Sequence, residues 1–344
     1  MRNNVTMRDI ANKIGVSSVT VSKALNDKEG VSEELRLKIQ GIASELGYRF
    51  NSTAKSMKEG LAYNIGVIIP EHFIGETQSF YLSFYQEITK HLQRYNYYGI
   101  LQTLSSHDEK NLVLPGTYYE NKVDGFIILG QIGNEYLNVL KEKEIPVICL
   151  DFYTDQTEVD CVITDNFYGM YEITNHLVKQ GHKDIAFVGN IYFTSSIQDR
   201  YLGYYKSLLE HRISLKDQFI INDRDDKGAF VDIELPDTLP TAFVCNCDQV
   251  AYNVITKLQS QGHRVPEDFS VVGFDNDIYS RISSPQLTTV QVDMAEMSKA
   301  AVKFVVEKVK NPLKTYGRVL VRGNIIHRDS VKKNDQKQLV SDKT

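Results

Sequence analysis

The sequence predicts a short all-α helix-turn-helix unit followed by a larger α/β domain of two lobes. The first fifty residues carry helix caps and apolar residues at helical spacing. From residue 64 onward, short apolar runs alternate with longer helical stretches, the pattern of a parallel sheet with helices on both faces. Eight or more such runs in a chain of 344 residues imply more than one lobe.

The composition is that of a soluble globular protein, with 42% hydrophobic and 24% charged residues. No apolar run approaches the roughly 18 residues that cross a bilayer, and the N-terminus has no apolar stretch resembling a secretion signal. We therefore expect no membrane association and a cytoplasmic location. The spacing of Cys245 and Cys247 fits neither a zinc site nor a redox pair. With Cys149 and Cys161 they are expected to be small buried thiols, and no metal is expected.

The net charge of −5 is unevenly distributed along the chain. Residues 1–60 hold ten Lys and Arg against seven Asp and Glu, a balance of +3, which leaves −8 on the remainder. A slightly basic head on an acidic body indicates that only the head approaches a polyanion. Solvated helical faces can show a similar excess, so this observation is supportive only.

Three short helices are expected in the first fifty residues. The segment 6–9 has the form of a capping box with Thr6 as N-cap, and Gly15 ends this helix in a turn. Ser17 caps a second helix at once, and Ser32 caps a third that ends at Gly47. The apolar residues facing inward are Ile10, Ala11, Ile14, Val21, Ala24, Leu25, Val31, Leu35, Ile39, Ile42 and Leu46. Two helices joined so tightly and braced by a third form a helix-turn-helix unit.

The second helix carries a high density of small polar residues. In a helix-turn-helix unit this helix enters the major groove of DNA, where short hydroxyls suit phosphate oxygens and longer groups suit base edges. The residues are Ser17, Ser18, Thr20, Ser22, Lys23 and Asn26. The alternative is a three-helix fragment whose polar residues only cap helices. The density of these residues favours DNA binding.

The larger domain is expected to alternate strands and helices. Expected strands are 65–69, 98–103, 125–129, 147–150, 161–163, 185–188, 242–245 and 270–274. Expected helices between them include 81–95, 167–180, 199–211 and 248–261. Ligands in such folds bind outside the carboxyl ends of the strands.

The motifs of residues 6–57 resemble the headpiece of LacI/GalR repressors. They are Thr6-x-x-Asp9-Ile10-Ala11, Gly15-Val16-Ser17-x-x-Thr20-Val21-Ser22-x-x-Leu25-Asn26, Gly47-Tyr48, Asn51 and Ala54-Lys55-Ser56-Met57. The resemblance implies that Ser18, Val19 and Lys23 read bases. The remaining polar DNA contacts are expected from Thr6, Ser17, Thr20, Ser22, Asn26, Ser32 and Asn51.

The resemblance also implies a hinge helix that includes Ala54, Lys55 and Met57. The family usually has arginine and leucine where this sequence has Lys55 and Met57. Methionine can act as an apolar wedge in the minor groove, so Met57 is expected to take that role. A helix of about eight residues is marginal alone in water, so it should order only on DNA beside a partner copy. We expect a helix-turn-helix domain at 1–49 and a hinge helix or linker at 50–62.

The rest of the chain resembles the sensor of the same family, which is similar to periplasmic sugar-binding proteins. The motifs include Val162-Ile163-Thr164-Asp165-Asn166-x-x-Gly169, Arg200-x-x-Gly203-Tyr204, Ser270-Val271-Val272-Gly273-Phe274-Asp275 and Pro285-x-Leu287-Thr288-Thr289-Val290. A two-lobed ligand-binding and dimerisation domain is therefore expected at 63–330. Its first lobe is about 63–163 plus 291–322, and its second about 164–290 plus 323–330. Crossings are expected near Ile163, Val290 and Gly323, and residues 331–344 are expected to be a disordered tail.

Effector residues are expected at strand ends. The carboxylates Asp151, Asp165 and Asp275 could accept hydrogen bonds from sugar hydroxyls, and Arg200 could donate. Each carboxylate could instead be a helix N-cap, above all Asp248. The resemblance places stacking residues at Phe80 and Tyr81, with Ser196 as a further polar contact and Cys247 where the family often has asparagine.

These observations together predict a non-enzymatic regulator. The sequence has no nucleophile elbow, phosphate-cradling glycine loop, dinucleotide fingerprint or paired-histidine metal motif, so neither catalysis nor a cofactor is expected. His182 is expected to be a turn residue. The resemblance implies a homodimer on a pseudo-palindromic operator, repressing carbohydrate-utilisation genes until a sugar effector binds. Alternatives are a nucleobase or sugar phosphate acting as corepressor, a cytoplasmic sugar-binding protein, or an enzyme.

Overall fold

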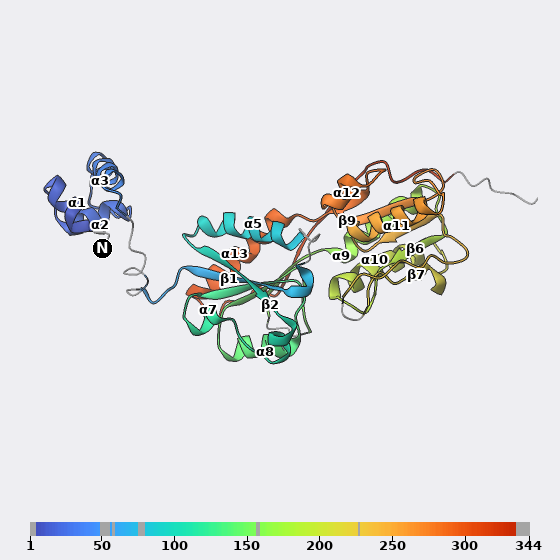
Figure 1. Cartoon of the computed structure of the whole chain (residues 1–344), viewed down its shortest axis with the longest axis horizontal. Coiled ribbons are helices and arrows are strands. Elements are labelled where there is room, and N and C mark those ends of the chain that lie inside the picture. The colour runs from blue at the N-terminus through green and yellow to red at the C-terminus, as the bar shows by residue number, and fades with distance from the viewer. Residues whose placement is uncertain are drawn as a thin grey trace, which may run out of the picture. The chain divides into compact units, whose positions relative to one another are not determined.

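The computed structural model describes residues 5–48, 56, 59–74, 80–155, 159–225 and 228–334. The chain divides into two compact units, residues 1–61 and residues 62–344, each of which has its own core (Figure 1). Within the described residues, no helix is long and apolar enough to cross a membrane.

The small unit is a three-helix bundle, as predicted. Its helices are α1 (Met7–Ile14), α2 (Ser18–Leu25) and α3 (Glu33–Glu45). The predicted N-caps Thr6, Ser17 and Ser32 each accept a hydrogen bond from a backbone N–H of the first helical turn. Gly15 ends α1 at φ +78°, in the left-handed region where glycine avoids the steric cost of a side chain. The core consists of Ile10, Ala11, Val21, Ala24, Ile39 and Ala43.

The large unit contains two six-stranded sheets, and each forms one lobe. The first sheet is parallel, in the order β11-β5-β4-β3-β1-β2. Its strands are β1 (Asn64–Pro70), β2 (Tyr98–Leu104), β3 (Gly125–Leu129), β4 (Val147–Leu150), β5 (Cys161–Thr164) and β11 (Arg318–Val321). The second sheet has the order β12-β10-β9-β8-β6-β7, with only β10 and β12 antiparallel. Its strands are β6 (Ile185–Val188), β7 (Ile220–Ile221), β8 (Ala242–Cys245), β9 (Ser270–Asp275), β10 (Thr288–Gln291) and β12 (Asn324–Ile326).

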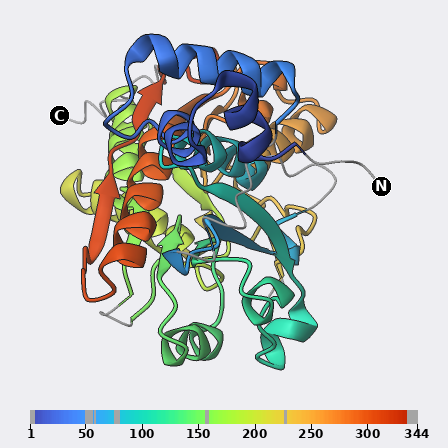
Figure 2. The same ribbon diagram turned by 90° about the vertical axis from the view of Figure 1, so that its left-hand side faces the viewer.

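Helices cover both faces of each sheet (Figure 1). The helices of the first lobe are α5 (Phe80–Gln93), α6 (Ser106–Lys110), α7 (Gly116–Tyr119), α8 (Asn134–Glu142) and α13 (Met294–Lys310). Those of the second lobe are α9 (Asn166–Lys179), α10 (Ser195–Glu210), α11 (Asp248–Ser260) and α12 (Ile278–Ile282). Short 3-10 helices lie at Glu71–Phe73 and Asp217–Phe219. Figure 2 shows α13, in orange-red, packed on the first sheet.

Both lobes repeat one topology. In each sheet the first five strands in chain order lie as 2-1-3-4-5, so the strand order reverses between β1 and β3 and again between β6 and β8. Ligands of such sheets bind in the crevice at this reversal, outside the carboxyl ends of the strands. The chain passes between the sheets three times, after Thr164, after Gln291 and between Val321 and Asn324.

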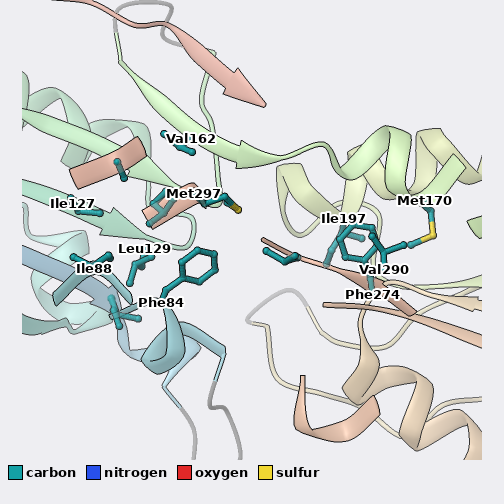
Figure 3. Close-up of a cluster of buried hydrophobic side chains, with 14 of the residues drawn as sticks. Phe84, Ile88, Ile127, Leu129, Val162, Met170, Ile197, Phe274, Val290 and Met297 are labelled. Carbon is teal, nitrogen blue, oxygen red and sulfur yellow. The ribbon is translucent and has the colours of Figure 1, made fainter. Parts of the chain in front are cut away.

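The cores consist of aliphatic and aromatic side chains from both faces of the sheets. In Figure 3, Phe84, Ile88 and Leu129 lie on the first-lobe side of the cluster. Met170 and Phe274 lie on the second-lobe side. Strands β3 to β6 and β8 are buried at every position, as strands covered by helices on both faces must be.

The closest helix packing in the second lobe is between α9 and α10, at Gly203. A Cβ built at Gly203 would lie 2.1 Å from the carbonyl oxygen of Phe167. We expect Gly203→Ala to lower the free energy of unfolding by about 3 kcal/mol, since overpacking forces two helices apart. Gly116→Ala is the matched control, because a Cβ there meets no atom within 4 Å. Equal stability of the two variants in urea denaturation would contradict the packing described here.

Candidate functional site

The exposed side of α2 carries the residues predicted to read bases. Ser18, Val19 and Lys23 are all exposed, and the Val19 side chain is 66% exposed although it is apolar. On the opposite side of the helix, Val21 and Ala24 are buried in the core. An apolar side chain left in water on a polar helix face is consistent with contact to a thymine methyl group.

Several other predicted DNA contacts take part in capping. The Thr6 hydroxyl donates to Asp9 at 2.7 Å, and the Ser17 and Thr20 hydroxyls lie 2.8 Å apart. Asn26 ends α2, and its side-chain amide donates to the carbonyl of Ser22 at 2.7 Å. Ser32 caps α3. These residues cap the three helices, of which α2 carries Ser18, Val19 and Lys23.

A brace between α2 and α3 was not anticipated from the sequence. Arg36 donates to the carbonyls of Ala24 and Lys28, at 3.2 and 2.9 Å, and pairs with Asp27 at 3.0 Å. Asp27 has φ +51°, so this turn is held by side-chain bonds as well as by its backbone. The predicted hinge residues Asn51, Ala54, Lys55 and Met57 lie outside the described residues.

The large unit contains a cavity of about 120 Å³ between its two lobes. The first lobe contributes residues that follow β1, begin α5 and follow β4, and the second lobe contributes the remaining wall. The predicted residues that line it are Phe80, Tyr81, Asp151, Ser196, Arg200, Cys247 and Asp275. The lining residues that sequence reasoning missed are Phe73, Thr194, Ile197, Arg224, Phe230, Asn246, Gln249, Asp277 and Tyr279.

Arg200 is the most constrained side chain of the second-lobe wall. It is 5% exposed, its Nε donates to Asn166 at 2.8 Å, and its Nη1 donates to the carbonyl of Asn246 at 2.6 Å. Its Nη2 lies 3.3 Å from Oδ1 of Asp275, and its guanidinium lies over the ring of Phe274. Since the guanidinium is fixed on three sides, it is preorganised to donate to a ligand in the cavity.

Two carboxyls line this cavity, the buried Asp151 and the largely buried Asp275, whose side chain is 11% exposed. The Tyr81 hydroxyl donates to Oδ2 of Asp151 at 3.0 Å. Within the described part of the chain, the buried Oδ1 of Asp151 has no hydrogen-bond partner, and Oδ1 of Asp275 has none besides its 3.3 Å contact with Nη2 of Arg200. A buried acceptor without a partner costs about 1–3 kcal/mol, a cost that a ligand hydroxyl would remove.

The backbone at both carboxylates is strained. Asp151 follows β4 with φ +71°, and Asp275 ends β9 with φ +108°. Non-glycine residues in this region cost on the order of 1 kcal/mol or more, and they cluster at ligand clamps. Because of the positive φ, the side chain of each residue does not follow the alternation of side chains along its strand.

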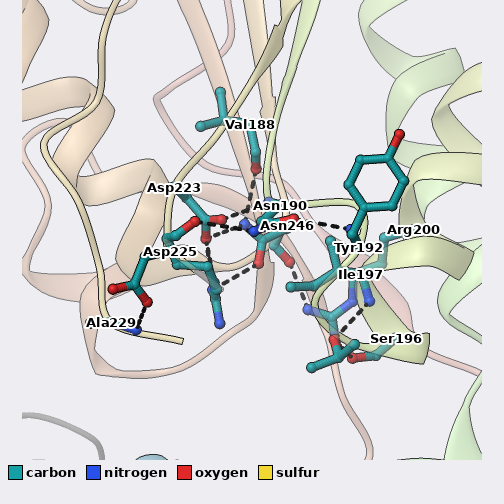
Figure 4. Close-up of polar contacts among 12 residues, drawn as sticks. Val188, Asn190, Tyr192, Ser196, Ile197, Arg200, Asp223, Asp225, Ala229 and Asn246 are labelled. Atoms are coloured by element: carbon teal, nitrogen blue, oxygen red, sulfur yellow. Dashed lines mark hydrogen bonds and ion pairs between the residues drawn. The ribbon is translucent and has the colours of Figure 1, made fainter. Parts of the chain in front are cut away.

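Asn246 connects the two arginines of the cavity. Its carbonyl accepts from Arg200, and its Oδ1 accepts from Nη2 of Arg224 at 3.3 Å (Figure 4). Its Nδ2 donates to Asp223 at 2.9 Å, and Asp223 in turn accepts two hydrogen bonds from Arg224, at 2.9 and 2.7 Å. Asn246 directly follows β8, so a search for polar residues at strand ends could have found it. Arg224 follows β7, and this strand of two residues is too short to show the alternation that predicts a strand from sequence.

Two predicted effector residues are not brought to the cavity. Asp165 caps α9 by accepting from the N–H of Tyr168 at 3.1 Å. Asp248 is fully buried and accepts from the Thr289 hydroxyl at 2.6 Å and from the N–H of Asp277 at 3.0 Å. Both carboxylates accept hydrogen bonds from backbone or hydroxyl donors at the ends of elements, and neither lines this cavity.

Cys247 lines the cavity as a neutral thiol. Burial raises the pKa of Cys247 to about 12, against the opposing effect of Arg224. Cys149, Cys161 and Cys245 are buried, and none of the four forms a disulfide. Within the described ranges, no group of three potential ligands is placed to hold a metal ion.

Direct contacts hold the two lobes together beside the cavity. The Tyr153 hydroxyl of the first lobe donates to Asp199 of α10 at 2.9 Å. Arg318 pairs with the same carboxylate at 3.3 Å, and its guanidinium lies 3.9 Å from the centre of the Tyr153 ring. Nearby, the N–H of Ser195 donates to the Gln131 side chain across the lobes at 2.9 Å.

The protonation of Asp275 should make stability depend on pH. Burial raises the pKa of Asp275 to about 8, although Arg200 acts to lower it. An unfolded Asp titrates near 4, so between about pH 4 and 8 the folded chain holds a proton that the unfolded chain has lost. The contribution is therefore fully present below pH 4 and is lost as the pH rises to 8. We expect the Tm of the unliganded protein to fall between pH 5 and 8.5, and to fall less in Asp275→Asn.

Asp268→Asn is the control for this measurement. Asp268 is paired with Arg264 at the surface, and hydrogen bonds from Arg264 lower its pKa. Its titration is therefore complete below pH 5, and the slope of Tm against pH should match that of the unmodified chain. If Asp275→Asn shows the same slope as Asp268→Asn, Asp275 is ionised throughout this range.

Comparison with known proteins agrees with these observations. Residues 6–51 match the family of bacterial regulatory proteins of the lacI family, and residues 174–331 match the periplasmic binding protein-like domain. The probable HTH-type transcriptional repressor ExuR of Bacillus subtilis (strain 168) is 30% identical over 339 residues, covering 96% of this chain and 99% of its own. The ribose operon repressor of Haemophilus influenzae is 27% identical over 331 residues, covering 95% and 98%. Among solved structures, the lac repressor dimer bound to operator aligns with a TM-score of 0.73 at 22% identity, covering 96% of this chain and 100% of that one.

The helix-turn-helix unit, the two-lobed domain and the relative of 30% identity define a ligand-responsive class of DNA-binding protein. The chain belongs to the LacI family and is a transcriptional repressor. Its relatives are repressors and not enzymes, as the sequence predicts for this chain.

Proposed function

We propose that this repressor controls carbohydrate-utilisation genes and is released from its operator by a sugar effector. It acts as a homodimer that places two headpieces on a pseudo-palindromic operator, in the cytoplasm. Ser18, Val19 and Lys23 read base edges, and Met57 acts as the minor-groove wedge. The effector lies against Asp151, Arg200 and Asp275.

The observation that carries the sugar assignment is a pair of carboxyls beside a fixed guanidinium. Within the described residues, Oδ1 of Asp151 has no partner, and Oδ1 of Asp275 has only its 3.3 Å contact with Arg200. Oδ1 of Asp151 and Oδ1 of Asp275 are acceptors, and Arg200 is a donor. A hydroxyl both donates and accepts, so a polyol satisfies both kinds of group. The aromatic rings of Phe80 and Tyr81 add apolar surface for its C–H faces.

The charge balance of the cavity argues against a sugar phosphate. Asp223 already compensates Arg224, and three further carboxyls, Asp151, Asp275 and Asp277, line the cavity with Arg200. A phosphate dianion would have to displace these carboxylates or lie close to them, and like charges in a buried site are costly. A nucleobase is the remaining alternative, since the aromatic rings could stack on it.

The effector acts by changing the relation between the lobes. A ligand bound to Asp151 of the first lobe and to Arg200 and Asp275 of the second adds to the bonds that Asp199 makes across the lobes. The resulting movement of one lobe against the other changes how favourably the hinge segments at 50–62 pair in the dimer. Coupling of about 1–3 kcal/mol would change operator affinity 5–150-fold.

Two measurements test the proposal. A thermal-shift screen of monosaccharides, oligosaccharides, sugar phosphates and purines should give a positive shift with a carbohydrate, since a ligand at 100 times its Kd adds about 2.7 kcal/mol. The same carbohydrate should release the protein from a DNA fragment of its genomic neighbourhood in a mobility-shift assay. A shift with purines alone, or no retarded fragment at low salt, would overturn the proposal.

A further inference from the structure

A second cavity lies between the lobes, directly beside the first. It has a volume of about 170 Å³, against about 120 Å³ for the effector cavity. The two cavities share Thr194 in their walls. Apart from Thr194, the lining of the second cavity includes Gln131 and Tyr153 of the first lobe and Tyr192 and Gln198 of the second lobe.

Among the described residues, the lining of this cavity contains hydroxyls, carboxamides and aromatic rings but no charged side chain. The effector cavity, by contrast, is lined by two arginines and three aspartates. This lining suits a neutral ligand group, because none of its described side chains is a cation that could replace the water of a phosphate or carboxylate. Uncharged donors and acceptors together with aromatic surface suit a sugar ring.

One polar atom of this cavity lacks a partner. Within the described residues, the Ser195 hydroxyl oxygen is buried and makes no hydrogen bond. Its backbone N–H is held by Oε1 of Gln131 at 2.9 Å, so the residue is fixed in place across the lobes. Buried hydroxyls are nearly always hydrogen-bonded, and a ligand hydroxyl in the cavity would supply the missing bond.

Bonds hold the ring of Tyr153 and the backbone of Tyr192 in place. Tyr153 is held by its bond to Asp199 and by the guanidinium of Arg318 over its ring. Tyr192 is 84% exposed, yet its backbone N–H is bound by Asn190 at 3.0 Å. Figure 4 shows the Tyr192 ring extending away from the Arg200–Asn246 network. An exposed ring whose backbone is held offers a surface on which a sugar can stack.

We propose that the cavity beyond Thr194 is a second sugar subsite, so that the effector is a neutral oligosaccharide with one unit in each cavity. This inference rests on the proposed function, because the first unit occupies the site of Arg200 and Asp275. A ligand that fills both cavities contacts Tyr153 and Ser195, whose bonds join the lobes.

The test compares each sugar with its disaccharides. Glucose, galactose, xylose and mannose are screened by thermal shift beside α- and β-linked disaccharides built from them, and hits are measured by calorimetry. We expect a disaccharide to bind at least tenfold more tightly than its monosaccharide. Tyr192→Ala and Gln198→Ala should lower disaccharide affinity about tenfold each and leave monosaccharide affinity unchanged. Gln218→Ala, an exposed glutamine of the same lobe, should change neither.

The outcomes separate this inference from the proposed function. If a monosaccharide binds as tightly as every disaccharide, or if Tyr192→Ala and Gln198→Ala behave as Gln218→Ala does, the subsite is overturned and the sugar effector stands. If no carbohydrate in the screen binds, the proposed function is overturned and this inference with it. Loss of disaccharide binding confined to the subsite variants supports the inference.

Discussion

Arg200→Met should abolish the response to effector while the headpiece still binds operator. The substitution keeps an unbranched side chain but removes the donors to Asn166, Asn246 and Asp275. Since the ligand loses its fixed guanidinium, we expect effector affinity to fall at least 100-fold, in line with about 3 kcal/mol for a hydrogen bond to a charged group. Calorimetry with the effector and a mobility-shift assay with operator measure the two properties separately.

Removing the guanidinium also leaves Asn166, the carbonyl of Asn246 and Asp275 without their donor, which costs stability, so a milder variant is needed. Arg200→Lys keeps the charge near Asp275 but loses the planar fork that reaches several acceptors at once. We expect it to fold and to lose effector affinity at least tenfold. Arg264→Ala removes an exposed pair with Asp268 and should leave both properties unchanged. Normal induction of Arg200→Lys would place the effector elsewhere.

Lys23→Ala should weaken binding to the specific operator by about 1–3 kcal/mol, the value of one good base contact. Lys23 is exposed on α2 beside Ser18 and Val19, outside the core. Because its loss removes sequence information, binding to a scrambled fragment should weaken much less. Titration of both fragments at several salt concentrations measures the difference.

Lys38→Ala is the matched control, since Lys38 is exposed on α3. It should change specific binding by no more than it changes non-specific binding. If Lys23→Ala lowers the affinity for both fragments equally and reduces the salt dependence by about one phosphate contact, then Lys23 holds the DNA backbone and does not read a base.

Local sequence signals were sufficient to predict the three helices of the small unit. Thr6, Ser17 and Ser32 are polar residues placed just before helical apolar spacing, and each proved to be an N-cap. The same kind of signal in the large unit was overlooked at α13, where Met297, Ala301 and Val305 recur four residues apart and are buried. Helix α10 also begins at Ser195, before the expected residue 199, with Thr194 as its cap.

The ligand site was predictable only in part, for a physical reason. A carboxylate after a strand can bind a ligand or a helix N-terminus, and sequence spacing does not distinguish the two. Asp151 and Asp275 line the cavity, whereas Asp165 and Asp248 satisfy neighbouring elements. The position of Arg224 depends in part on a tertiary contact, since it is held by Asn246, which follows strand β8, as well as by the preceding Asp223.

The first lobe is not a continuous piece of the chain, and this affects how the protein is made. Its sheet needs β11 at the edge and its core needs α13, both of which come after the whole of the second sheet except β12. The ribosome must add about 130 residues between β5 and α13, which takes on the order of 10 s at typical rates of synthesis. The DNA-reading head, whose helices end at residue 45, is complete long before that. During each round of translation, the DNA-binding unit is therefore synthesised before the ligand-binding unit is complete.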